Sequence, residues 1–289
     1  MSLRAIPDGF DPGCVTAIDA RLEAVERDHR VAIGFAIESG SRAWGFPSPD
    51  SDYDCRFVFV RPVEQHLTPW PRRDVIETPL DNELDINGWE VAKALRLLLK
   101  GNAVVIEWLT SPVIYRADPW FRGALLDFAR SHGSRIGTQR HYLHLGERQR
   151  RTYYADGKAV KLKKLFYALR PAAALRWLRL HPEAQIAPMH FPTLMAECDP
   201  PVDVAELAEE LMRRKAVTRE LGDAPLPEAI DRFIAQEFAM ARAELPGEPV
   251  RLAPASKAAA ETLFREAVGR LTTGAPSAPT RLDPEPGCA

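Results

Sequence analysis

Cysteine is scarce in this 289-residue chain: it has only four, and no two of them form a CxxC pair. No histidine lies at zinc-finger spacing from them. The sequence therefore argues against a disulfide framework and a structural zinc site, and it is typical of a reducing compartment. No stretch approaches the roughly 18 uncharged apolar residues that a membrane-spanning helix needs, and residues 1–12 lack the apolar core of a signal peptide. We therefore expect a cytoplasmic protein that has no membrane partner.

An excess of charge of one sign is lacking too. The chain has 38 Lys and Arg residues against 40 Asp and Glu residues, a formal net charge of -2. This excludes a globally basic nucleic-acid coat protein but leaves room for a local basic patch. With 46% hydrophobic and 27% charged residues, the composition is that of an ordinary globular protein. Its length suffices for one large domain or two small ones.

Hydrophobic periodicity predicts a helix and several strands in the first third of the chain. Apolar residues at three- and four-residue spacing predict a helix over 15–29. Strands are expected over 31–37 and 54–60, where apolar, aromatic and β-branched residues gather. Two weaker strands are expected over 74–78 and 83–86, separated by a four-residue hairpin turn.

Helical patterns prevail afterwards. Asn87 resembles an N-cap with Glu at the third helical position, and the helix that it opens should end at Gly101-Asn102. We expect no strand after residue 115. The further helices are expected at residues 117–131, 136–151, 157–170, 173–180, 203–221, 227–243 and 255–271.

The chain is thus interpreted as an α/β domain followed by an all-helical domain. The boundary is placed near Ser111-Pro112, which gives domains at residues 1–111 and 112–272. The stretch 273–289 is rich in Pro, Ala, Gly and Ser and lacks apolar periodicity, so we expect a disordered tail.

The most informative segment contains Asp52 and Asp54, which lie two apart at the entry to a predicted strand. Their side chains should project to one face, and two adjacent carboxylates repel unless a cation lies between them. Magnesium, with one or two carboxylates and substrate phosphates, is the natural partner. Gly40-Ser41, just after a buried strand, offers backbone N–H groups and a hydroxyl for a phosphate. A structural Asp-x-Asp in a solvated loop is the alternative, which the order of strand, Gly-Ser, loop, Asp-x-Asp and strand disfavours.

This arrangement resembles the DNA polymerase β-like nucleotidyltransferase superfamily, and more narrowly its RlaP/YcgL type, which is associated with RNA repair. The resemblance covers about residues 30–180 in order, and more loosely the helices to about 245. The blocks that carry it are GSRAWG at 40–45, SDYD at 51–54, DINGWE at 85–90, KGN at 100–102, EWLTSP at 107–112 and KKLFYALR at 163–170.

The resemblance implies an α+β fold, in which a polymerase β-like domain with a small mixed sheet precedes an all-helical domain. It also implies that Asp52 and Asp54 bind two magnesium ions, with manganese as an alternative. Asp85 would bind one of these ions while activating the attacking hydroxyl, and Glu83 is its second-ranked substitute. Gly40 and Ser41 would hold the β- and γ-phosphates of the incoming nucleotide.

A basic helix supplies further candidates. Lys163, Tyr167 and Arg170 fall at i, i+4 and i+7 on one face of the helix predicted to end at Pro171. A magnesium-bound triphosphate needs cations opposite the carboxylates, so these residues are candidate nucleotide contacts, with Lys164 ranked behind them. A solvated helix face is the alternative.

Other side chains leave two readings open. Arg42, beside the Gly-Ser turn, is a candidate phosphate contact or a partner of Asp50. Trp44 stacks on a base or, as favoured, packs against the helical domain. His141 and His144 share a helix face, but no third metal ligand accompanies them, so core or surface roles are favoured.

The sequence thus predicts a metal-dependent nucleotidyltransferase that passes NMP from an NTP to an acceptor hydroxyl, with an RNA end in RNA repair as one such acceptor. Little covalent chemistry is required of the protein, which supplies positioning and charge. The acceptor (RNA, tRNA, a small molecule or a protein side chain), the base preference and the oligomeric state are left open. A nucleotide- or RNA-binding regulatory module without turnover is the alternative.

Overall fold

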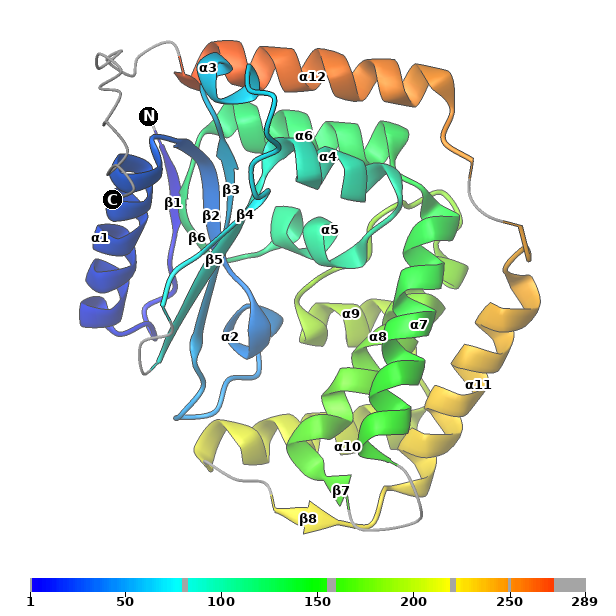
Figure 1. The fold of residues 1–289 in the computed structure, drawn as a ribbon. Helices are drawn as coiled ribbons and strands as arrows, with labels where there is room; N and C mark the ends of the chain where they lie inside the picture. Colours follow the sequence, from blue (N-terminus) through cyan, green and yellow to red (C-terminus); the bar gives the residue numbers. More distant parts are fainter. Residues whose placement is uncertain (1, 80–82, 155–159, 219–221, 249–250, 273–289) are drawn as a thin grey trace, which may run out of the picture.

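The computed structural model of the chain describes residues 2–79, 83–154, 160–218, 222–248 and 251–272. A mixed β-sheet with helices on both faces lies beside a group of longer helices (Figure 1). Among the described residues, no helix is both long and apolar enough to cross a bilayer.

The sheet has six strands in the spatial order β1-β6-β2-β3-β5-β4. Only β3 and β5 run parallel, and all other neighbouring strands are antiparallel. The first residues of β3 and β5 lie side by side, and the register of this parallel pair places Asp54 directly opposite Asp85. The strands are β1 Leu3–Ala5, β2 Ala32–Glu38, β3 Tyr53–Val60, β4 Val75–Glu77, β5 Leu84–Glu90 and β6 Ile114–Ala117.

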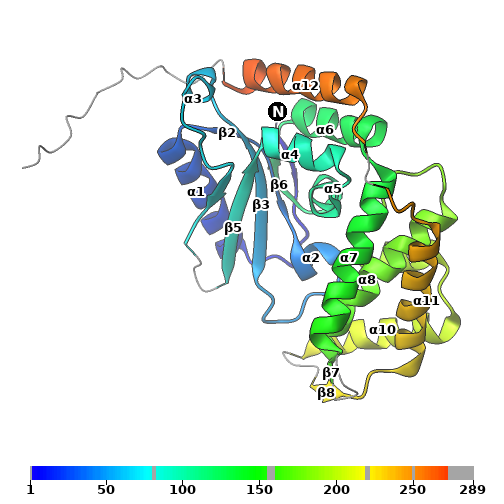
Figure 2. The same cartoon turned by 45° about the vertical axis from the view of Figure 1, so that its right-hand side comes forward.

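Helices cover both faces of this sheet. Helix α1, Pro12–His29, packs Ile18 and Leu22 against one face, where Phe57 and Phe59 of β3 point. The other face packs against four helices, one of which comes from the end of the described chain (Figures 1 and 2). These helices are α4 Val91–Leu99, α5 Ala103–Thr110, α6 Pro119–His132 and α12 Pro254–Thr272.

A third apolar core lies among the helices beyond the sheet. It includes Phe46, which follows the short helix α2, Gly40–Trp44, and stacks on Phe166 with ring centroids 4.3 Å apart. This contact ties the loop after β2 to the helical part. The helices that build this core are α7 Arg135–Tyr153, α8 Leu162–Leu180, α9 Phe191–Cys198, α10 Val202–Val217 and α11 Glu228–Glu244.

Helix α8 corrects the expectation that a helix ends at Pro171, because the helix runs through that residue to Leu180. An interior proline removes one backbone hydrogen bond and crowds the preceding turn. Here Pro171 is buried against Gly146 of α7, where an added Cβ would come within 3.0 Å of the proline Cβ. Tight helix packing therefore outweighs the local preference of proline to end a helix.

Strand β6 corrects the expectation that no strand follows residue 115. Its four residues carry too short a pattern to be recognised, yet β6 lies between β1 and β2 and bonds to both. A short ladder also pairs β7, Val160–Lys161, with β8, Asp223–Ala224. Tertiary pairing, not local sequence, defines these strands.

Several other boundaries differ from expectation. Asn87 lies inside β5, not at a helix N-cap, and Glu90 precedes α4 instead. Helices α2, α3 (Val63–His66), α5 and α9 were not predicted. The α+β class itself is confirmed. The two-domain division at residue 111 stays a prediction, and the predicted tail and most of the predicted turn at 79–82 lie outside the described residues.

Candidate active site

The Gly-Ser turn begins where β2 ends. Gly40 adopts a φ of +59°, in the left-handed region that favours glycine, and opens the five-residue helix α2. An added Cβ at this position would collide with the carboxylate of Asp54. The close approach of this turn to the second Asp of Asp-x-Asp therefore depends on glycine.

Substitution of Gly40 by alanine is expected to destabilise the protein. The left-handed conformation alone costs a non-glycine residue about 1–2 kcal/mol, and the collision with Asp54 adds to that cost. Urea unfolding measures the loss. Gly123→Ala in α6 is the matched control, because an added Cβ there meets nothing within 4 Å. Equal stability of the two variants would contradict the strain argument.

A buried acid, Glu38, fixes the start of β3. One of its carboxylate oxygens accepts the backbone N–H of Asp54 at 2.9 Å, and the other accepts the Tyr115 hydroxyl at 2.5 Å. Burial raises the pKa of Glu38 to about 8. The backbone N–H of Ser39 adds a bond of 2.8 Å to the carbonyl of Asp54. The sequence did not single out Glu38, which lies within an otherwise apolar strand.

The loop between α2 and β3 is held by its own serines and by Arg42. The hydroxyl of Ser41 donates to that of Ser51 at 2.9 Å, and Ser51 also accepts the backbone N–H of Ser48 at 2.8 Å. Arg42 donates to the carbonyl of Ser51 at 2.7 Å, and its guanidinium lies 3.9 Å from the ring centroid of Tyr53. Arg42 thus stabilises this loop without lining the pocket described below. Its predicted phosphate contact stays a prediction.

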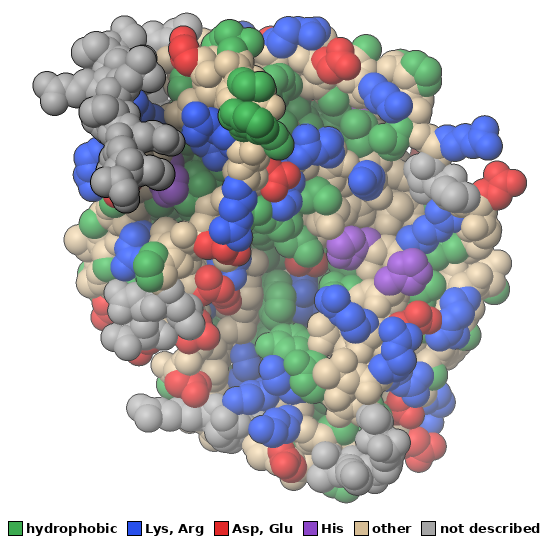
Figure 3. All heavy atoms as spheres, in the orientation of Figure 1, with side chains coloured by type: hydrophobic (Ala, Val, Ile, Leu, Met, Phe, Trp, Pro, Cys, Tyr) green, Lys and Arg blue, Asp and Glu red, His purple; other side chains and the backbone are tan. Residues whose placement is uncertain are grey.

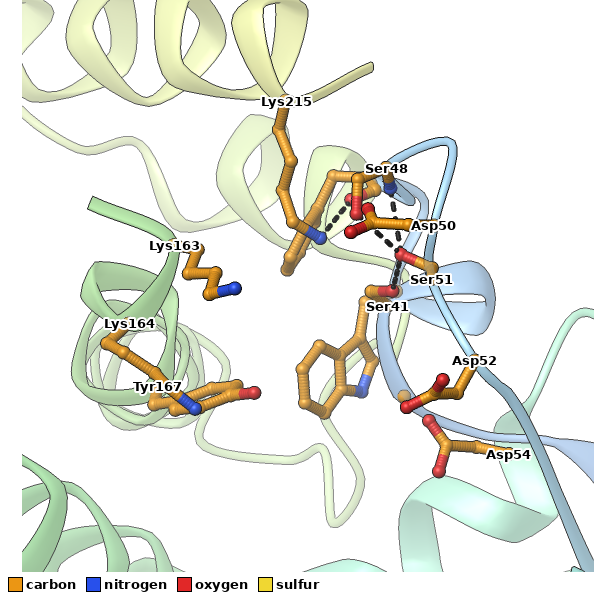
Figure 4. A pocket seen from close by; sticks show the side chains of 13 residues that line it. Ser41, Ser48, Asp50, Ser51, Asp52, Asp54, Lys163, Lys164, Tyr167 and Lys215 are labelled. Carbon is orange, nitrogen blue, oxygen red and sulfur yellow. Dashed lines mark hydrogen bonds between the residues drawn. The ribbon is translucent and has the colours of Figure 1, made fainter. Parts of the chain in front are cut away.

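A pocket of about 260 Å³ lies between this loop and the helical part (Figure 4). One wall comes from α2, the loop and the start of β3, and the other comes from α8 and α10. Figure 4 shows the acidic side chains of the first wall facing the lysines of the second. The pocket is lined by Gly40, Ser41, Trp44, Phe46, Ser48, Asp50, Ser51, Asp52, Asp54, Lys163, Lys164, Tyr167 and Lys215.

The two acids of Asp-x-Asp lie next to each other in the pocket wall (Figure 4). Burial raises the pKa of Asp54, and the charges of Asp85 and Asp52 raise it further, while Arg56 opposes the shift. Asp85 is Asp54's neighbour on β5 but does not line the pocket. Glu83, the second-ranked substitute, is exposed and precedes β5.

These acids fit a metal that arrives with a phosphate ligand. Among the described residues, no group of three or more His, Cys, Asp and Glu is placed to hold a metal ion. Asp52 and Asp54 nevertheless supply hard oxygen donors on one pocket wall. Magnesium commonly takes only one or two carboxylates from the protein and completes its shell with phosphates and water.

Lysines form the opposite side of the pocket. Lys163 and Lys164 come from the first turn of α8, and Lys164 Nζ lies 4.7 Å from the ring centroid of Tyr167. Lys215 of α10 is buried and donates to the carbonyl of Phe46 at 2.8 Å. Burial lowers the pKa of Lys215 to about 8, although the charge of Asp50 opposes this shift.

Lys215 escaped the sequence analysis, although a signal for it was present. The buried residues of α10 are Val204, Ala208, Leu211 and Lys215, at spacings of four, three and four. A lysine on the apolar stripe of an amphipathic helix is unusual, because a buried charge is costly unless it is paired or solvated. Such a lysine is a candidate for a functional site.

Arg170 does not join the row predicted for it. Lys163 and Tyr167 line the pocket, but Arg170 is buried and forms an ion pair of 2.9 Å with Glu107 of α5. Its guanidinium lies 4.0 Å from the ring centroid of Trp44. Arg170 therefore packs on the ring of Trp44 but does not itself line the pocket. Its predicted nucleotide contact stays a prediction.

Trp44 itself lines the pocket and packs against the helical part. Its ring lies 6.2 Å from that of Tyr167, edge to face, and 5.8 Å from that of Phe46. The favoured packing reading thus agrees with its contacts, while its exposure to the pocket leaves base stacking open.

Basic side chains are spread over the face of the molecule that Figure 3 shows, on the sheet side as well as over the helices, with acidic side chains among them. Helix α7 contributes Arg148 and Arg151, which are exposed and have no ion-pair partner among the described residues.

Comparisons with known proteins agree with the sequence resemblance. Residues 15–266 match the RlaP family, described as the RNA repair pathway DNA polymerase beta family. A Bacillus subtilis (strain 168) protein described as uncharacterized protein YcgL is 38% identical over 217 residues, which is 75% of this chain and 82% of the relative.

A solved structure described as a nucleotidyltransferase-like protein from Exiguobacterium sibiricum 255-15 covers 88% of this chain and 74% of its own. It has 12% identity and a TM-score of 0.27, which is too low to support an argument.

Proposed function

We propose that this chain, which belongs to the RlaP family of RNA repair pathway DNA polymerase beta proteins, is a metal-dependent nucleotidyltransferase. It would pass NMP from an NTP to an acceptor hydroxyl. The observation that carries the proposal is the division of one pocket into a carboxylate wall, with Asp52 and Asp54, and a lysine wall. That division suits a metal-bound polyphosphate, because the carboxylates would bind the metal ion and the lysines would bind the negatively charged phosphate oxygens.

The lysine wall would hold the polyphosphate. Lys163, Lys164 and Lys215 offset its negative charge from the helical side. Gly40 lets the turn approach the Asp54 carboxylate closely, and the Ser41 hydroxyl lies at the same wall. Together these residues would fix the α-phosphate near the carboxylates, and such positioning is a large part of phosphoryl-transfer catalysis.

The carboxylate wall would hold magnesium, with manganese as an alternative. Asp52 and Asp54 are the ligands that line the pocket, and Asp85 lies on the adjacent strand. The bound metal supplies Lewis-acid activation of the acceptor hydroxyl and stabilises the charge of the leaving pyrophosphate. Asp85 is in addition the residue proposed to accept the proton of that hydroxyl. Asp85 is favoured over Glu83 for this role because Asp85 lies opposite Asp54 in the sheet, whereas Glu83 precedes β5.

The acceptor is proposed to be an RNA or tRNA end. Support comes from the family description and from Arg148 and Arg151 on α7, which are exposed and lack ion-pair partners among the described residues. Such arginines suit a phosphodiester backbone, whose binding weakens steeply as salt concentration rises.

The pH dependence of nucleotide binding tests the role of Lys215. Because its pKa is lowered to about 8, the amine is charged at pH 7 and largely neutral at pH 9. NTP affinity is therefore expected to fall as the pH rises through 8. Lys215→Arg stays charged throughout, so its profile should be flatter. Binding titrations at both pH values measure this, and parallel profiles for the two proteins would contradict the role.

Labelled nucleotides test the function itself. The protein is incubated with α- or γ-labelled NTP, magnesium and separate RNA, tRNA and protein acceptors. Label from the α position is expected on a nucleic-acid acceptor, with none from the γ position. Transfer of γ-label would instead indicate a kinase, and label on protein would correct the acceptor.

A nucleotide- or RNA-binding module without turnover is the second candidate. The observation that favours it is that, in the described chain, the acids do not form a ready metal cluster. Such a module would bind NTP in the same pocket but would release no pyrophosphate with magnesium or with EDTA.

A further inference from the structure

Arg56 links the second acid of Asp-x-Asp to the acid on the neighbouring strand. One of its guanidinium nitrogens, Nη2, lies 2.9 Å from Oδ1 of Asp54 and 2.6 Å from Oδ2 of Asp85. The other terminal nitrogen, Nη1, donates to the carbonyls of Asp85 at 2.6 Å and Cys55 at 3.1 Å. The side chain is 15% exposed. Arg56 thus spans β3 and β5 beside Asp54, which lines the pocket.

The strand geometry makes this bridge possible. Asp54 and Arg56 are two apart on β3 and project to the same face, and the register places Asp54 opposite Asp85. Both oxygens of Asp85 are engaged, because the Asn87 amide donates to Oδ1 at 3.3 Å while Arg56 holds Oδ2. Asp85 is therefore turned toward a guanidinium, and it does not line the pocket.

We propose that Arg56 is the internal counter-cation of the Asp54–Asp85 pair and competes directly with a divalent ion for these two carboxylates. A divalent ion gains Asp85 only when the guanidinium gives up Oδ2. Free of metal, the bridge offsets the repulsion between two acids that face each other across neighbouring strands. This inference rests on the proposed function, since it assumes that these acids receive a metal.

Binding of Mn²⁺ alone, followed through the electron paramagnetic resonance signal of the free ion, tests the competition without any turnover. Arg56→Gln keeps a polar side chain of similar reach but removes the charge. It is expected to tighten Mn²⁺ binding by about tenfold. This is the gain if the guanidinium leaves the two carboxylates available in only about a tenth of the wild-type molecules and the variant leaves them available in all. Unchanged or weaker Mn²⁺ binding in this variant would overturn the proposal and make Arg56 a brace that holds the acids in place for metal.

Arg56→Lys separates direct occupancy from simple charge. Lysine keeps the positive charge but cannot present two nitrogens as the planar fork of arginine does. Under direct competition Arg56→Lys also binds Mn²⁺ more tightly than the wild type, although less tightly than Arg56→Gln. Wild-type affinity in Arg56→Lys, with tightening in Arg56→Gln, would show that only long-range charge acts and would overturn direct competition.

Thermal unfolding with and without Mn²⁺ gives a second readout on the same variants. In EDTA, Arg56→Gln is expected to melt below the wild type because Asp54 and Asp85 then repel each other. Because ligand binding to the native state raises its stability, Mn²⁺ should raise the melting temperature of Arg56→Gln more than that of the wild type. An equal rise in both proteins would contradict the competition.

The same titrations distinguish this inference from the proposed function. Equal Mn²⁺ binding by the wild type and both Arg56 variants would overturn the competition alone. Absence of Mn²⁺ binding from all three proteins, even when NTP is present, would overturn metal-dependent transfer as well.

Discussion

Asp54→Asn is expected to reduce nucleotidyl transfer by at least about a hundredfold while leaving the protein folded. Even residues that only support metal ligands typically cost 10–100-fold when they are changed, and Asp54 is proposed as a ligand itself. The asparagine keeps the shape of the side chain. Loss of the carboxylate relieves its repulsion with Asp85 and Asp52, which offsets the loss of its ion pair with Arg56. Steady-state rates with saturating NTP measure the effect, with thermal unfolding as the check on folding.

Asp50→Asn is the matched control for this experiment. Asp50 also lines the pocket but lies outside Asp-x-Asp, on the loop near Lys215. Its substitution should alter KM for NTP more than kcat. Retention by Asp54→Asn of more than about a tenth of wild-type kcat, which corresponds to a loss under about 1.4 kcal/mol, would contradict the metal assignment.

Arg170→Ala is expected to lower the free energy of unfolding by about 3–5 kcal/mol, because removal of one partner strands the other charge of a buried ion pair. Glu107 would lose its 2.9 Å partner in a site where both side chains are about nine-tenths buried. Trp44 would lose the guanidinium stacked on its ring. Urea denaturation measures the change.

Lys164→Ala on the same helix gives the contrasting result. Lys164 lines the pocket and has no ion-pair partner in the part of the chain that the structure describes. Its substitution should raise KM for NTP and lower stability less than Arg170→Ala does, since the half-buried Lys164 loses only its contacts with the Tyr153 and Tyr167 rings, each contributing about 0.5–1 kcal/mol. An Arg170→Ala protein as stable as the wild type but weakened in NTP binding would restore Arg170 to the nucleotide-facing row.

Local pattern sufficed for the parts of the fold that bury a continuous apolar stripe. Helix α1 and strands β2 and β3 were predicted within a few residues, because Ile18, Leu22 and the apolar run of β2 carry the expected periods. Strand β6 was missed because its four residues depend on partners at both edges. Pro171 misled the prediction because its fit against Gly146 is a tertiary property.

The candidate site shows the same division. Asp52, Asp54, Gly40 and Ser41 were predicted from the order of their motifs, and Lys163 and Tyr167 from helical spacing. The structure brings all six to one pocket. The side-chain contacts of other residues depend on segments far away in the chain, which no local pattern reports. These residues are Arg42, Asp85, Arg170, Lys215, Glu38 and Arg56.

Release of pyrophosphate from NTP is the most direct measurement of the central claim, which is that the carboxylate and lysine walls together perform metal-dependent nucleotidyl transfer. With magnesium and an RNA acceptor, the wild type is expected to release one pyrophosphate for each NMP joined to the acceptor. EDTA should abolish this release, and so should Asp54→Asn. Pyrophosphate release that persists in EDTA or in Asp54→Asn, or its absence with every NTP and acceptor tried, would contradict the account.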